Sequence, residues 1–501
     1  MRILEDKKIT IKRLRRMLFG PTSEKTEQII AQALALAQGK AHPGSAQTLE
    51  IKVKRPPAGH GRNGKANYRG AKTQWVGHER LKPGNRCPGC RKGKVYNQPE
   101  PGILVRVTGQ APLAAAVYHL QKLRCNLCGD IFEARPPKGV GREKYDATSG
   151  AMIGLLKYGS GLPFNRLEKL QAGMGIPLAT ATQWEIVSGA AKKMQPAYDE
   201  LEHQAAQGDV LHNDDTTMKI LERMGKRRQK NVQRGGQTGE ITPGRAGIFT
   251  SGIVSAQGKR RVALFVTGPK HAGENLGAVL AQRTQERPAP IQMCDALSRN
   301  PAKNFKTILA NCLAHGRRPF ADVLENFPQE CAYVLKTLQR VYKNDAIAKK
   351  RKMTAAGRLK FHQAQSGPLM EKLQRWMVRQ IEDKKVEPNS GLGEAIAYML
   401  KRWDPLTLFL RKAGAPLDNN ICERALKKAI LHRKNSLFYK TDNGARVGDL
   451  YMSLIHTSEL NGADPFDYLT QLQRHAKEVR AHPDKWMPWN YPRARSPDQQ
   501  T

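Results

Sequence analysis

The sequence predicts an α/β protein whose core is interrupted by an all-helical insertion. Three observations predict this class. Residues 207–300 contain several apolar runs of strand length, residues 305–412 are almost wholly helical in pattern, and acidic residues follow the ends of two strand-like runs. Small basic and cysteine-containing segments precede this core.

The chain is strongly basic throughout its length. Its 501 residues include 84 Lys and Arg against 44 Asp and Glu, a formal net charge of +40. Such a charge is also typical of ribosome-associated proteins and of proteins that bind many partners non-specifically. Because basic residues recur in every segment, however, contact with a long track of nucleic-acid phosphates is favoured. The start of the chain lacks an apolar signal region and no run is long enough to span a bilayer. We therefore expect a cytoplasmic protein.

The first part of the chain is predicted to contain little packed structure. Residues 1–40 have the pattern of a helix. Residues 41–85 form a basic linker rich in Gly and Pro that cannot bury a core. Because this linker has almost no acids, an arm that follows DNA is favoured over an inert spacer.

Two C-x-x-C pairs predict a zinc-binding domain over residues 86–135. The pairs are Cys87 with Cys90 and Cys125 with Cys128, separated by strand-like sequence at 103–107 and 114–120. Two such turns supply four thiolates, which complete a tetrahedral Zn²⁺ shell with a structural role. A redox dithiol is the alternative.

Residues 143–200 have the pattern of three helices and suggest a helix-turn-helix DNA-binding domain. Gly173 and Gly175 break the pattern before a last helix at 179–191. Thr180 or Thr182 is predicted to cap this helix, and Thr180, Thr182 and Gln183 are predicted to contact DNA. An ordinary three-helix packing unit is the alternative.

Residues 207–318 predict the first part of the core. Strands are expected near 210–221, 248–254 and 261–266, followed by a helix at 273–283 and a strand at 290–294. An RNase H-like fold begins in this way, with three meander strands, a helix and a strand that ends in an acid. The remaining predicted regions are a helical insertion at 319–412, the second part of the core at 413–480 and an unfolded C-terminal tail at 481–501.

Three acidic residues are the predicted catalytic residues. Asp214 and Asp295 follow apolar strand-like runs, and Glu423 lies just inside a helix that Asp418 or Asn419 can cap. Each alone could be a turn or surface residue, but together they can hold two Mg²⁺ ions, or Mn²⁺, for phosphodiester chemistry. Because side chains alternate along a strand, Asp215 is the weaker candidate.

Other metal-binding types are treated as packing residues. Cys312 and His315 form a C-x-x-H pair for which packing is favoured over metal binding, because no second soft pair is obvious nearby. Cys294 and Cys422 flank the acids, but Mg²⁺ prefers oxygen ligands.

Blocks of sequence in a fixed order resemble the insertion-sequence-66 family of bacterial transposases. The blocks are Leu18-Phe19-Gly20, the two C-x-x-C pairs, Leu156-Lys157-Tyr158-Gly159-Ser160-Gly161-Leu162-Pro163, His212-Asn213-Asp214, Cys312-Leu313-Ala314-His315, Leu417-Asp418-Asn419-Asn420 with Glu423-Arg424, and Arg433-Lys434-Asn435-Ser436. Two positions depart from the family: Asp215 stands where Glu is common, and Ala296-Leu297 follow Asp295 in place of Gly-Tyr.

The resemblance implies a DDE transposase with Asp214, Asp295 and Glu423 on an RNase H-like core. Such an enzyme cuts double-stranded DNA at the terminal inverted repeats of an insertion sequence and joins the 3′ ends to target DNA. Arg424, Lys427 and Lys428 would neutralise nearby phosphates. We expect a homo-oligomer on DNA and accessory proteins from the same element. The resemblance to a bacterial family also implies a nucleoid-associated location in a bacterial cytoplasm. A non-catalytic DNA-binding protein and a nuclease without strand transfer are the alternatives.

Overall fold

The computed structural model describes residues 80–97, 111–124, 131–141, 143–224, 247–302 and 304–491. The chain divides into a small unit at 44–110 and a larger one formed by 1–43 with 111–501. The predicted N-terminal helix, most of the basic linker, the strand-like run at 103–107 and the second C-x-x-C pair lie outside the described residues.

A short hairpin and a group of helices precede the main sheet. Strand β1 (Lys122–Arg124) pairs antiparallel with β2 (Ile131–Glu133), whereas the predicted strand at 114–120 is absent. The helices are α3 (Ala147–Gly154), a π-helical turn (Leu155–Gly159), α4 (Phe164–Gly173) and α5 (Thr180–Ala206). The predicted Thr caps are wrong: Ala179 is the N-cap of α5, no side chain caps this end, and Thr180 is already helical.

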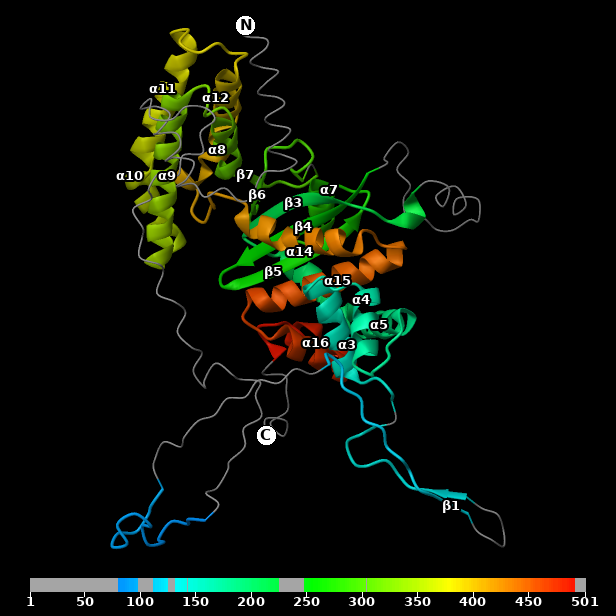
Figure 1. The fold of residues 1–501 in the computed structure, drawn as a ribbon. Coiled ribbons are helices and arrows are strands. Elements are labelled where there is room, and N and C mark those ends of the chain that lie inside the picture. Colours follow the sequence, from blue (N-terminus) through cyan, green and yellow to red (C-terminus); the bar gives the residue numbers. More distant parts are fainter. Residues whose placement is uncertain are drawn as a thin grey trace. The chain divides into compact units, whose positions relative to one another are not determined.

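A five-stranded mixed sheet forms the core of the larger unit (Figure 1). Its strand order is β5-β4-β3-β6-β7. Strand β4 is antiparallel to both of its neighbours, β5 and β3, and β6 and β7 run parallel to β3. The bounds are β3 (Val210–Met218), β4 (Ile248–Gln257), β5 (Arg260–Gly268), β6 (Ile291–Cys294) and β7 (Ile308–Asn311). Strand β7 was not predicted, because its residues lie in a segment with a largely helical pattern.

Helices cover the central strand β3 on both sides. Helix α7 (Ala272–Leu280) and helix α14 (Asn420–Ser436) both contact β3 and β4 (Figure 1). Because side chains alternate along a strand, even-numbered residues of β3 such as His212 face α14, and odd-numbered ones such as Asp215 face α7. The two acids of β3 are therefore directed to different sides of the sheet.

Helix α15 (Asp442–Leu460) lies along the edge strand β5 and bonds to its backbone through side chains. Backbone N–H groups of alternate strand residues donate to helix side chains spaced four residues apart. The pairs are Thr267 with Asp449 (2.7 Å), Phe265 with Ser453 (2.9 Å), Ala263 with Thr457 (3.0 Å) and Arg261 with Asn461 (3.2 Å), the last acceptor being the helix C-cap.

The helical insertion packs against the β6–β7 side of the sheet. Met293 and Ala310 from the strands share an apolar cluster with Leu335 and Met377 from the insertion. Its helices are α8 (Leu313–Asp322), α9 (Pro328–Lys350), α10 (Ala355–Gln365), α11 (Gly367–Glu382), α12 (Gly391–Lys401) and α13 (Trp403–Leu406), with a 3₁₀ turn (Leu408–Leu410). Helix α10 was not predicted.

The prediction of an unfolded tail is wrong for its described part. After α16 (Pro465–Arg474) and α17 (Ala476–Ala481), a 3₁₀ turn (Pro483–Trp486) follows, and Trp486 and Met487 are buried in the core. The ring of Trp486 stacks on His475 at 4.8 Å, which fixes the segment through apolar contact. Among the described residues, no helix combines the length and apolar character that crossing a membrane would need.

Candidate active site

Asp214 lies on β3 directly opposite Gly252 of β4. Helix α14 passes close to this point, because a side chain at Gly252 would place its Cβ 2.9 Å from Leu426. The thiol of Cys422 donates to the Gly252 carbonyl oxygen at 3.3 Å. This close approach brings the first turn of α14, which carries Glu423, beside Asp214.

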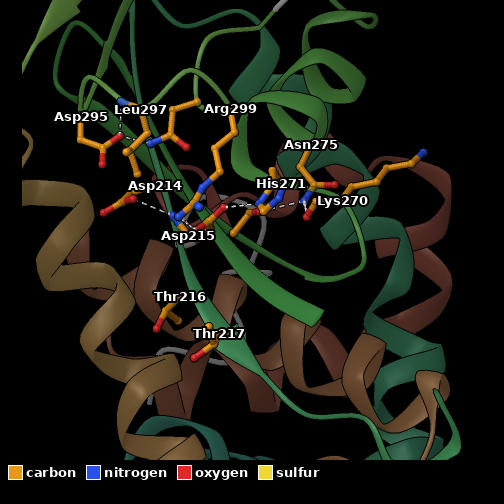
Figure 2. A network of polar contacts seen from close by, with 12 residues as sticks. Asp214, Asp215, Thr216, Thr217, Lys270, His271, Asn275, Asp295, Leu297 and Arg299 are labelled. Carbon is orange, nitrogen blue, oxygen red and sulfur yellow. Dashed lines mark hydrogen bonds and ion pairs between the residues drawn. The ribbon is translucent and has the colours of Figure 1, made fainter. Parts of the chain in front are cut away.

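Asp295 is the first residue after β6. The last paired residues of the two parallel strands are His212 and Met293, and Asp214 and Asp295 each lie two residues beyond them. Their side chains therefore emerge at neighbouring positions (Figure 2). The Asp295 carboxylate accepts hydrogen bonds from the Asn300 amide and from the Leu297 N–H at 3.4 Å.

The beginning of α14 is fixed by a buried polar contact with β3. The Asn419 side-chain amide donates to the Asn213 carbonyl at 3.1 Å and its oxygen accepts from His212 Nδ1 at 3.0 Å. Burial lowers the pKa of His212 to about 4, so the ring is neutral and Nδ1 carries the proton. The Asp418 carboxylate accepts from the Asn420 N–H at 3.2 Å. The hydrogen bond to the first turn of α14 therefore comes from Asp418, although Asn419 is the N-cap residue.

The negative charges of the other two predicted acids act on Asp214. Burial, and after it the negative charges of Asp295, Asp215 and Glu423, raise the pKa of Asp214 to about 7, and one backbone hydrogen bond opposes this shift. The structure thus brings these acids into one neighbourhood. Their oxygens do not all lie within 4.8 Å of one another, the spacing that sharing a single ion would require.

Asp215 is engaged on the opposite side of the strand. Its carboxylate accepts from His271 Nδ1 at 2.9 Å and pairs with the Arg299 guanidinium at 3.3 Å (Figure 2). His271 is the N-cap of α7, and Arg299 lies in the loop that follows Asp295. Asp215 therefore ties this loop to the sheet. This network was not predicted, because nothing in the sequence connects His271 with Arg299.

A second cluster adjoins Glu423. The potential ligand atoms of Cys312, His315 and Glu423 all lie within 4.8 Å of one another. His315 Nε2 is 3.8 Å from Glu423 Oε1, and its Nδ1 is buried with no hydrogen-bond partner among the described residues. Burial raises the pKa of Cys312 to about 11. The C-x-x-H spacing was the sequence signal, although packing was the favoured interpretation.

The predicted DNA-contacting residues have different environments. Gln183 is fully buried, and its amide donates to the carbonyls of Phe164 and Leu178, so it holds α4 against α5 and is not available to bases. Thr180 and Thr182 are half-buried. Arg424 and Lys427 are exposed on α14, whereas Lys428 pairs with Glu459 at 3.0 Å.

The first cysteine pair forms a tight turn in the smaller unit. The Cys87 N–H donates to the Gly93 carbonyl at 2.8 Å, and the Gly93 N–H donates to Cys90 Sγ at 3.4 Å. Backbone hydrogen bonds from Gly93 and Lys92 lower the pKa of Cys90, which favours the thiolate. Cys125 and Cys128 lie outside the described residues, so the zinc ion remains a prediction.

Comparison with known proteins identifies the family. Similar curated proteins come from Sinorhizobium fredii (strain NBRC 101917 / NGR234). Uncharacterized protein y4jD is 28% identical over 331 residues, covering 64% of this chain and 61% of the relative. Uncharacterized protein y4hP is 27% identical over 402 residues, covering 75% and 67%. The chain thus spans about three fifths to two thirds of the length of these relatives.

The model of the Transposase IS66 family matches residues 144–447, which include the sheet, the insertion and all three acids. The chain therefore belongs to the IS66 family of transposases.

Proposed function

We propose that the protein is a DDE transposase that cuts at the terminal inverted repeats of an insertion sequence and joins the 3′ ends to target DNA. The observation that carries the proposal is the position of the three acids. Asp214 and Asp295 each lie two residues beyond the last pair of β3 and β6, and Asp214 is opposite Gly252, where the first turn of α14 carries Glu423 close to the sheet. Membership of a transposase family supports this reading of the acids.

We further propose that the core is RNase H-like. Three antiparallel strands followed by two parallel strands, in the order β5-β4-β3-β6-β7, support this assignment. So does the position of the acids, one on the central strand, one after the adjacent parallel strand and one on a helix that packs on the sheet.

The acids suit a pair of Mg²⁺ ions. Within the described part of the chain, no Lys or Arg forms an ion pair with Asp214 or Asp295, so their charges are left for another cation. Asp214, as the central acid, would contact both ions, and Asp295 and Glu423 would each hold one. Two ions are about 4 Å apart in such sites, so the outer carboxylates need not share a ligand sphere. When bound, the ions stabilise the attacking and leaving oxygens of phosphodiester cleavage.

Other parts of the chain would serve DNA binding. The exposed Arg424 and Lys427 follow Glu423 on α14, where they would pair with phosphates beside the acids. We propose that the helices at 143–200 recognise the terminal repeats, that Cys87, Cys90, Cys125 and Cys128 bind a structural zinc ion, and that the protein acts as a homo-oligomer, with accessory proteins from the same element as possible partners.

The test is cleavage of a duplex that carries the element's end, with Mg²⁺ present. Asp214→Asn should abolish cleavage, by at least about a thousandfold, because the amide cannot hold the ions, while binding to the duplex persists. The control is Asp209→Asn, just before β3, where the carboxylate is 60% exposed and pairs only loosely with Arg287 at 3.6 Å. Cleavage retained in Asp214→Asn would refute the proposal, and cleavage without joined products would indicate a nuclease.

A further inference from the structure

The cluster of Cys312, His315 and Glu423 combines ligand types that Mg²⁺ does not use together. A thiol sulfur, an imidazole nitrogen and a carboxylate oxygen lie within 4.8 Å of one another. Mg²⁺ takes oxygen ligands, whereas Zn²⁺ and Co²⁺ accept sulfur, nitrogen and oxygen in one shell. The chemistry of the cluster therefore differs from that of the neighbouring acids.

A backbone N–H group holds the sulfur of Cys312. The Asn419 N–H donates to Sγ at 3.3 Å. A hydrogen bond of this kind fixes the position and orientation of a metal-binding group. The same contact joins the loop before α8 to the beginning of α14, so Cys312 and Glu423 are held together by the fold.

The cluster is closed at one end and open at the other. Cys312 is fully buried, whereas the side chains of His315 and Glu423 are 28% and 38% exposed. The ligand atoms thus extend from the partly exposed imidazole and carboxylate to the buried sulfur. Three protein ligands leave a fourth tetrahedral position for water.

We propose that Cys312, His315 and Glu423 form a binding site for a borderline-soft divalent cation such as Zn²⁺, which shares only Glu423 with the proposed Mg²⁺ ligands. On binding, the Cys312 thiol releases its proton to solvent, a sulfur–metal bond forms, and His315 coordinates through Nε2 with its ring proton on Nδ1. The site stands independently of the proposed activity. If Glu423 is also a catalytic acid, which rests on the proposed function, this cation would hold Glu423 and inhibit cleavage.

The test is Co²⁺ binding by the full chain, with Co²⁺ alone as the probe. Equilibrium dialysis would count bound ions in wild type, Cys312→Ala, His315→Ala and the control Cys331→Ala, which removes another fully buried thiol of the same apolar cluster. Wild type and Cys331→Ala should bind equally. Cys312→Ala and His315→Ala should each bind one ion fewer, and Cys312→Ala should lose part of the near-ultraviolet thiolate-to-cobalt absorption.

The design separates this site from the C-x-x-C pairs and from the proposed activity. All four proteins keep Cys87, Cys90, Cys125 and Cys128, so any ion bound there cancels in the comparison. His315→Ala decides the outcome if Cys312→Ala folds poorly, because the His315 side chain is partly exposed whereas Cys312 is fully buried. Equal ion counts in wild type and His315→Ala would overturn the proposal, whatever the result of the cleavage test.

Discussion

Gly252 shows how one missing side chain positions the acids. It is paired with Asp214 across the sheet, and a Cβ there would lie 2.9 Å from both Cγ and Cδ2 of Leu426 on α14. Gly252→Ala should therefore displace α14, lower the free energy of unfolding by about 1–3 kcal/mol, and reduce end cleavage because Glu423 moves with the helix. Thermal denaturation and the cleavage assay measure the two effects.

The matched control is Gly268→Ala at the end of β5. A Cβ at Gly268 meets nothing within 4 Å, so the same substitution in another strand should change neither stability nor cleavage appreciably. Equal losses in both variants would show that general strand properties, rather than the approach of α14, determine the effect.

Asp449 predicts a pH dependence of stability. It is fully buried, and burial raises its pKa to about 8 against the hydrogen bonds from Thr267. An unfolded Asp titrates near 4. Between roughly pH 4 and pH 8 the folded chain therefore holds a proton that the unfolded chain has lost, so the free energy of unfolding falls as pH rises through this window.

Asp449→Asn should remove this loss. An amide can still accept from the Thr267 N–H and donate to its hydroxyl, but it does not ionise. The variant should melt near the wild-type temperature at pH 4.5 and above it at pH 8, with a limiting gain of roughly 1.4 kcal/mol per pH unit. Asp404→Asn, at a carboxylate that is 90% exposed, should leave the pH dependence unchanged. A wild-type response from Asp449→Asn would contradict the assignment.

At single positions, the sequence patterns identified functional residues more reliably than they identified the residues that contact them. The acids at Asp214 and Asp295 were recognised because each follows an apolar run, a local signal. The burial of Gln183 was not, because its amide bonds to carbonyls of a preceding helix and loop. The approach of His315 to Glu423 likewise depends on how the insertion returns the chain to the sheet.

At the scale of elements, the contact between α15 and β5 is made by a row of polar side chains. Ser453 and Thr457 are fully buried and accept from the N–H groups of Phe265 and Ala263. Ser453→Ala or Thr457→Val would leave a buried N–H without its acceptor, so each should lower the free energy of unfolding by about 1–3 kcal/mol. Chemical denaturation measures the change.

Ser458→Ala provides the comparison on the same helix. Ser458 is equally buried, but its hydroxyl donates to the Ile455 carbonyl of its own helix. Removing this hydroxyl leaves every N–H group of β5 with its acceptor. A smaller decrease in the free energy of unfolding, about 1 kcal/mol or less, is therefore expected. If Ser458→Ala were as damaging as Ser453→Ala, the contact with β5 would not be the source of the stability.

Long elements were predicted more successfully than short ones. Strands β4 and β5 were predicted because apolar residues fill them and a turn at Gly258 joins them. Strand β7 has only four residues, half of them buried, and its helix-rich surroundings dominated the pattern. The segment at 483–491 was misjudged because its prolines suggested disorder, whereas Trp486 and Met487 anchor it to the core.

At the scale of the whole molecule, the net charge of +40 predicts DNA binding that weakens steeply with salt. If Arg424 and Lys427 each contact a phosphate, the double variant to Ala should lower the slope of log affinity against log salt by about 2. Lys428→Ala should change it less, because Lys428 is already paired with Glu459. Slopes measured by fluorescence anisotropy that are equal for all three proteins would place the phosphate contacts elsewhere.

The row of bonds between α15 and β5 also limits how copies of this chain can assemble. Exposed sheet margins often recruit a foreign strand, which extends the sheet across a subunit boundary. Here the outward amides of Arg261, Ala263, Phe265 and Thr267 are already occupied by one helix. Any multimer built on DNA must therefore associate through surfaces other than this margin, without β-augmentation there.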